Sequence, residues 1–435
     1  MLTAGRRPVV PAAAWNALHP SSLSISALEN CKGSTGAEAE SAASILKVVG
    51  EEVDHEVQQE EATWWPRLVA RLNSMLRENK LGARAAANVF WAHGELYDKV
   101  DACNEPLVVE LSKYVQQKAS AMKAQKLSNC LLCAAKLEDS VPKVSVAAPD
   151  IAKCIVKGVE NMVPQDLSNN LWAAARLQDA VPEVLTAVPA IASKVPSNVA
   201  GMVPQALSNT LWAAAKLQDA VPEVLTAVPA LASRIPDKVE VMVPQDLSNN
   251  LWAAAKLQEA VPAVLTAVPA MSSRIPDKVK DMVSQELSNS LWAAARLQDA
   301  VPEVLIAVPA IASHIPDKAE DMVPQALSNS LWAAARLQDA VPEVLTAVPA
   351  LASRILDKVE DMVPQELSTC FWAAAKLQDA VPGVLVAMHV LSEQLTCQIM
   401  VLSLQDLQMS VWAASELGED ELERQLRQKL AQRKR

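Results

Sequence analysis

A tandem repeat of forty residues constrains this chain more than any other feature of its sequence. The stretch Pro164-Gln-Asp-Leu-Ser-Asn-Asn-Leu-Trp-Ala-Ala-Ala-Arg-Leu-Gln178 returns with few changes. Its tryptophan recurs every 40 residues, at Trp172, Trp212, Trp252, Trp292, Trp332, Trp372 and Trp412. Periods of about 20–50 residues are typical of solenoids, in which each repeat packs only on its neighbours. A chain of 435 residues built in this way needs no single large core.

The composition of the repeats favours helices. Alanine, leucine and valine dominate, and no glycine occurs between Pro204 and Ala380, although tight β-hairpins usually need one. We expect a first helix at about 164–178 and a second helix that opens at Pro182. Pro189 should kink or split this second helix near 185–189, because proline removes a backbone hydrogen bond. We expect it to end between Ser193 and Pro196, with a short extra turn before the next repeat.

These patterns predict an all-α fold, an α-solenoid of about nine helical hairpins of ~40 residues over residues 63–417. The count includes two degenerate units around Trp91 and Leu132. Residues 1–62 form an N-terminal extension, in which 1–28 resemble a transit peptide or are simply disordered and 29–62 are a linker. Residues 418–435 are expected to form a charged capping helix, with leucines four residues apart, and a basic tail.

Several kinds of chemistry lack their sequence signatures. We see no glycine-rich phosphate loop, the five histidines are scattered, and Cys130-x-x-Cys133 has no second pair to complete a zinc site. The sequence therefore predicts no enzyme, no metal and no cofactor. No run approaches the ~18–20 apolar residues that cross a bilayer. An odd count of seven cysteines indicates reduced thiols in an intracellular protein. The net charge of −11 argues against indiscriminate binding of nucleic acid but does not exclude a local basic strip.

One cationic position recurs four residues after the tryptophan position. It is occupied in seven consecutive units by Lys136, Arg176, Lys216, Lys256, Arg296, Arg336 and Lys376. In a stacked array these side chains would form a line of positive charge, which suits a phosphate backbone. Alternatively, each cation pairs with an acid such as Asp179 at the C-terminal end of its helix.

Two other positions allow two interpretations each. The tryptophan either packs sideways on the adjacent first helix or offers a stacking platform to bases. The position two residues before it holds small residues, among them Asn170, Thr210, Asn250, Ser290 and Ser330. Such variation fits a base-reading position in a helical-repeat RNA binder, and it also fits a tight helix contact that admits only small side chains.

The segment Pro-Gln-x-Leu-Ser-Asn-x-Leu-Trp-Ala-Ala-Ala-Lys/Arg-Leu resembles the first-helix signature of octotricopeptide-like repeats. Similar helical repeats accompany RAP domains and FAST-kinase-like proteins and occur in the RNA-editing substrate-binding complex. The match covers about residues 84–417. The resemblance implies an α-solenoid that binds single-stranded RNA in a mitochondrion or chloroplast.

By the same resemblance, the protein would act in RNA processing, editing, stability or translation, with other proteins of an RNA-processing complex as further partners. The cations (Arg176, Lys216, Lys256, Arg296 and Arg336) and the small residues would then face RNA. Without a targeting segment the location would be cytoplasmic. The alternative function is a protein-interaction scaffold that binds an extended peptide or helix on its concave face.

Overall fold

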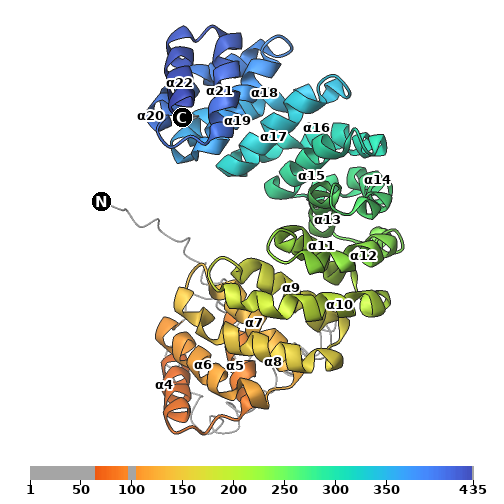
Figure 1. The fold of residues 1–435 in the computed structure, drawn as a ribbon, viewed down its shortest axis with the longest axis vertical. Coiled ribbons are helices and arrows are strands. Elements are labelled where there is room, and N and C mark those ends of the chain that lie inside the picture. Colours follow the sequence, from red (N-terminus) through yellow and green to blue (C-terminus); the bar gives the residue numbers. More distant parts are fainter. Residues whose placement is uncertain (1–63, 97–103, 434–435) are drawn as a thin grey trace. The chain divides into compact units, whose positions relative to one another are not determined.

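The computed structural model describes residues 64–96 and 104–433, and all elements in these ranges are helical. The predicted all-α class is thereby confirmed for the described chain. The chain divides into two compact units (Figure 1). The first ends at Gly158 and also holds residues 179–184, and the second holds 159–178 and everything from Leu185 onward. The predicted N-terminal extension, 1–62, and the last two residues of the basic tail lie outside the described residues.

The first unit is a small helical cluster. Its core contains Phe90, Leu107 and Leu111, which are all fully buried. The Tyr114 hydroxyl donates a hydrogen bond to the Leu81 carbonyl at 2.7 Å and so ties α6 to the connection between α4 and α5. The elements are α4 (Trp64–Arg77), α5 (Ala83–Leu96), α6 (Glu105–Lys118), η2 (Ala119–Ala121), α7 (Ala124–Leu137), η3 (Pro142–Ala147) and α8 (Ala148–Gly158).

The second unit is a regular two-layer stack. The first helix of each repeat, here called an A helix, packs on the A helix of the next repeat (Figure 1). The A helices are α9 (Pro164–Leu177), α11 (Pro204–Leu217), α13 (Pro244–Leu257), α15 (Ser284–Leu297), α17 (Pro324–Leu337), α19 (Pro364–Leu377) and α21 (Leu404–Leu417). The B helices are α10 (Val188–Asn198), α12 (Val228–Arg234), α14 (Val268–Lys278), α16 (Val308–Lys318), α18 (Val348–Lys358) and α20 (Met388–Gln398).

Prolines split the second half of each repeat, as the sequence predicts. Pro182 opens a 3₁₀ helix, η5 (Pro182–Ala187), and Pro189 then lies in the first turn of α10, where a missing backbone N–H is tolerated. The same 3₁₀ segment recurs as η7 (Pro222–Ala227), η9 (Pro262–Ala267), η11 (Pro302–Ala307), η13 (Pro342–Ala347) and η15 (Pro382–Ala387). The expected extra turn also appears, as η4 (Val159–Asn161), η6 (Val199–Gly201), η8 (Val239–Val241), η10 (Val279–Asp281), η12 (Ala319–Asp321) and η14 (Val359–Asp361).

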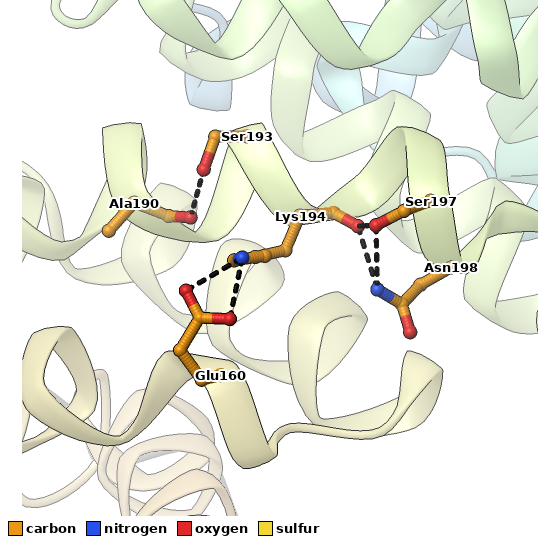
Figure 2. Close-up of polar contacts among 6 residues, drawn as sticks. All are labelled: Glu160, Ala190, Ser193, Lys194, Ser197 and Asn198. Carbon is orange, nitrogen blue, oxygen red and sulfur yellow. Dashed lines mark hydrogen bonds and ion pairs between the residues drawn. The ribbon is translucent and has the colours of Figure 1, made fainter.

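The predicted end of the B helix between Ser193 and Pro196 is wrong. The helix α10 continues through Pro196 to Asn198. In the last turn the Ser197 hydroxyl and the Asn198 amide both donate to the Lys194 carbonyl, at 3.0 and 2.9 Å (Figure 2). A proline in the final turn costs one backbone bond, and these side chains supply additional hydrogen bonds to that turn.

Close packing between A helices sets the geometry of the stack. Ala173 and Ala174 are at most 1% exposed, and their small size lets neighbouring helices approach closely. The buried Ser168 hydroxyl donates across the contact to the Ala206 carbonyl at 3.1 Å, and Ser288 repeats this bond to Ala326 at 3.0 Å. The A helices from α11 to α19 each pack against their own B helix and against both neighbouring A helices.

The last helix, α22 (Asp420–Arg433), packs on α21 where the sequence predicts a capping helix. Leu422 and Leu426 are buried in that contact, whereas Glu421 and Arg424 are exposed and form an ion pair. The outward face of the final element is thus charged, as expected for the end of a repeat array.

A buried carboxylate near the start of α13 generates a prediction about stability. The Asp246 carboxylate accepts a hydrogen bond from the Val243 N–H at 3.4 Å and is 5% exposed, and burial raises its pKa. Because its pKa is higher in the folded chain, this group favours folding most below the unfolded pKa of about 3.9, and the contribution is lost as pH rises through the folded pKa. Asp246→Asn keeps an oxygen acceptor without the charge. We expect it to unfold at a higher urea concentration than the parent at pH 7, with a gain of up to about 1 kcal/mol.

The difference should shrink at about pH 3.5, where the parent carboxyl group is itself protonated. Asp339→Asn, at an exposed acid, is the control for the loss of one negative charge. Lower stability of Asp246→Asn at pH 7 would show that attraction between the carboxylate and the helix N-terminus outweighs burial.

Candidate nucleic-acid interface

One stripe of each A helix faces solvent. On α9 it consists of Gln165, Asn169, Trp172 and Arg176, whose spacing of four, three and four residues places them on one side of the helix. Arg176 is exposed and the other three are half-buried, whereas most other side chains of the helix are buried. The stripe recurs with the same side chains or close substitutes on the A helices from α11 to α19, whereas α21 has Met409 and Glu416 at two of the four positions.

The tryptophans of this surface contact each other across repeats. The rings of Trp172 and Trp212 have centroids 6.3 Å apart with planes tilted by 31°. Trp292 and Trp332 repeat this arrangement at 6.3 Å, and the pair on α19 and α21 does so at 6.2 Å. The sideways packing that the sequence allowed is therefore confirmed for these pairs. Each ring nevertheless stays half-buried, so part of it remains open to solvent.

The predicted cations of the second unit lie on these rings. We call them the A cations: Arg176, Lys216, Lys256, Arg296, Arg336 and Lys376. The Arg176 guanidinium is 5.9 Å from the Trp172 centroid, and the corresponding distances are 5.8 Å for Arg296 on Trp292 and 5.7 Å for Arg336 on Trp332. The Lys376 ammonium is 4.3 Å from the Trp412 centroid. Lys136 is exposed at the same position of α7, in the first unit.

Two lysines each lie over two rings. The Lys216 ammonium is 5.7 Å from the centroid of Trp212 and 5.2 Å from that of Trp252. The Lys256 ammonium is 5.8 Å from Trp252 and 5.2 Å from Trp292. Three consecutive rings therefore alternate with two ammonium groups. Attraction of a cation to an aromatic face within about 6 Å is worth roughly 0.5–1 kcal/mol at an exposed site.

Carboxylates hold the cations of the B helices instead. We call Lys194, Arg234, Arg274 and Arg354 the B cations. Lys194 pairs with Glu160 of the preceding 3₁₀ turn at 2.7 Å (Figure 2), and Arg274 pairs with Glu240 at 2.7 Å and Asp277 at 2.8 Å. Arg234 pairs with Asp237 at 2.6 Å, and Arg354 pairs with Asp357 at 2.6 Å and Glu320 at 3.2 Å.

The A cations differ in this respect. Among the described residues, Lys216, Lys256, Arg296 and Lys376 have no carboxylate within the 4.0 Å of an ion pair. Arg336 has one, the 85% exposed Asp299, at 3.8 Å. An exposed pair of this length contributes little. Pairing with carboxylates, which the sequence allowed for the position four residues after the tryptophan, is thus observed mainly at the B cations.

Successive A cations interact electrostatically with one another. The pKa of Lys256 is lowered, chiefly by burial and then by the positive charges of Arg296 and Lys216, with Asp219 acting in the opposite direction. Neighbouring A cations therefore repel one another, although an exposed acid such as Asp219 or Asp299 follows each of them by three residues. An anion laid along the A cations would relieve that repulsion.

A row of glutamines fixes the spacing of the A cations. The Gln258 amide donates to the Arg296 carbonyl of the next repeat at 3.3 Å, and Gln298 donates in the same way to the Arg336 carbonyl at 3.3 Å. Gln338 repeats the bond to the Lys376 carbonyl at 3.3 Å. This role was not predicted, although the same glutamine follows the tryptophan by six residues in six successive repeats.

The small polar residues are not part of the surface, which corrects the expectation that they face RNA. Asn170, Thr210, Asn250, Ser290 and Ser330 are between 0% and 1% exposed. The Thr210 hydroxyl donates to its own helix, at the Ala206 carbonyl, 2.6 Å away. This burial fits the alternative of a tight contact that admits only small side chains, because A helices such as α11 and α13 pack against their own B helix and against an A helix on either side.

Other chemistry finds little support in the described residues. They contain no group of three or more histidine, cysteine or acidic side chains that could hold a metal ion, and none of their helices is long and apolar enough to cross a membrane. Burial raises the pKa of the Cys130 and Cys370 thiols, which disfavours reactive thiolates.

An open pocket lies on the surface formed by the A-helix stripes. It is lined by Gln258, Glu259, Arg296, Asp299, Ala300, Trp332 and Arg336.

The shared lysine contacts predict a measurable coupling. Trp252→Leu and Lys216→Gln should destabilise the fold by less in combination than the two single effects added together, because the second change removes a contact that the first has already lost. The expected coupling is about 0.5–1 kcal/mol. Leucine already occupies the equivalent position, Leu132, in the first unit. Urea unfolding followed by circular dichroism measures the cycle, and strict additivity would show that the ammonium and the ring do not interact.

A scan against models of protein families and a search of curated proteins found no match to this chain.

Proposed function

We propose that this protein is a non-enzymatic helical-repeat protein that binds single-stranded RNA along the A cations and the tryptophan row. The observation that carries the proposal is the contrast between the two sets of cations. The B cations are held by carboxylates, whereas at least four A cations lie on half-buried rings with no carboxylate partner among the described residues. A repeated row of such charges suits a repeated row of phosphates.

Single strands suit this surface better than duplexes. Half-buried indole rings accept bases by stacking, and stacking needs bases that are not already paired. Glutamine and asparagine amides, such as Gln165 and Asn169, lie beside the rings on the same stripe and can hydrogen-bond to base edges. The resemblance to octotricopeptide-like repeats supports the same assignment. It also favours nine repeats, a mitochondrial or chloroplast location and a role in RNA processing, which we include in the proposal.

The competing function is a scaffold for an extended acidic peptide. The same amides can pair with a peptide backbone, and the same cations can pair with carboxylates. We favour RNA because the cation recurs in every repeat from Arg176 to Lys376, as evenly spaced phosphates require. A peptide would need an acidic residue at a matching interval throughout its length.

The test compares two variants with equal changes in charge. The first variant has glutamine in place of four A cations, Lys216, Lys256, Arg296 and Arg336. The second has glutamine in place of the four B cations, Lys194, Arg234, Arg274 and Arg354. We expect the first to lose most of its affinity for a fluorescent 20-nucleotide RNA strand and the second to bind like the parent. In a titration between about 50 and 200 mM salt, the slope of log affinity against log salt should become shallower by about 3 in the first variant, because each phosphate contact contributes ~0.7 for single strands.

Helicity measured by circular dichroism controls for folding of both variants. Equal loss of binding in both would mean that RNA responds only to net charge. A parent that ignores RNA but binds a polyglutamate peptide through the A cations would establish the scaffold instead.

A further inference from the structure

The tryptophan row is not uniform along its length. Some neighbouring rings touch directly, as Trp172 and Trp212 do with centroids 6.3 Å apart. At two successive steps a lysine ammonium lies over both neighbouring rings instead: Lys216 over Trp212 and Trp252, and Lys256 over Trp252 and Trp292. We call these two steps the lysine gaps.

A nucleobase needs room that directly touching rings do not offer. Aromatic faces stack at about 3.5–4 Å, so a base between two rings requires them to be roughly 7–8 Å apart. Tilted rings with centroids at 6.3 Å leave no such space. In a lysine gap the space over the rings is taken by the end of a flexible side chain that can move away.

We infer that the two lysine gaps each accept one base of a single-stranded RNA, and that Lys216 and Lys256 move out to the flanking phosphates as the bases enter. This inference rests on the proposed function and names the part of the surface that holds bases. Two bases on opposite faces of Trp252 would lie about 7 Å apart, twice the stacking distance. One extended sugar–phosphate link can span that interval, about double the 3.4 Å rise of a stacked strand.

The electrostatics of the gaps favour this exchange. Burial, and then the charges of Arg296 and Lys216, lower the pKa of Lys256 and so disfavour its charged form. Moving its ammonium to a phosphate replaces two like-charged neighbours with an opposite charge. An arginine is less suited to leave, because its planar guanidinium stacks well on indole. Arg296 lies over Trp292 beside a pair of rings that touch, Trp292 and Trp332.

The test exchanges lysine and arginine without changing charge. One variant carries Lys216→Arg and Lys256→Arg, and the matched control carries Arg296→Lys and Arg336→Lys. Each is titrated with a 15-nucleotide RNA strand and with an abasic ribose–phosphate strand of equal length. We expect the parent and the control to bind the base-bearing strand at least about tenfold more tightly than the abasic strand. The Lys→Arg variant should lose most of this preference while its affinity for the abasic strand stays the same.

The possible results separate this inference from the proposed function. A parent that binds both strands equally well is a polyanion binder without base gaps, which overturns the inference alone. A Lys→Arg variant that keeps the full preference places the bases elsewhere and also overturns it. A parent that binds neither strand overturns the proposed function and this inference together. Unchanged affinity for the abasic strand shows that the Lys→Arg variant is folded.

Discussion

The close approach of successive A helices is the constraint on which the rest of this structure depends. Small side chains such as Ala173 and Ala174 allow the approach, and the buried Ser168 hydroxyl secures it with a bond to the next helix. Because successive A helices pack in a similar way, equivalent side chains repeat at a fixed interval. At several steps a ring therefore contacts the next ring, the Gln298 amide reaches the next carbonyl, and each A cation lies on an indole face. The surface is a consequence of the packing beneath it.

Positively charged side chains have different partners in the layer of A helices and in the layer of B helices. B cations such as Lys194 and Arg274 pair with carboxylates of the preceding repeat and so add ionic contacts between repeats. A cations contact aromatic faces, which attract a cation without neutralising it. A chain with a net charge of −11 can in this way keep a row of cations that are not paired directly with carboxylates. Attraction to the rings offsets part of the repulsion between neighbouring cations such as Lys216 and Lys256.

The sequence predicted what depends on local pattern and failed where several helices act together. The bounds of the A helices and the split of the B helices follow from periodicity and from Pro182 and Pro189. Asn250 was misassigned because a helical wheel with one buried stripe ignores the two A-helix neighbours of α13, which bury the sides of the helix as well. The roles of Gln298 and of the ring–cation contacts cross from one repeat to the next. No pattern within a single repeat reveals which side chain of the next one lies opposite.

The bond from Ser168 to Ala206 also bears on how such a protein can evolve. Its donor and acceptor lie 38 residues apart, and Ser288 and Ala326 make the same contact with the same separation. Deleting or duplicating one whole repeat would join helices of nearly identical sequence at the junction. Unequal recombination within the gene can therefore change the length of the array by whole repeats. The number of stacked A helices then becomes a trait that can change without redesign of the repeat itself.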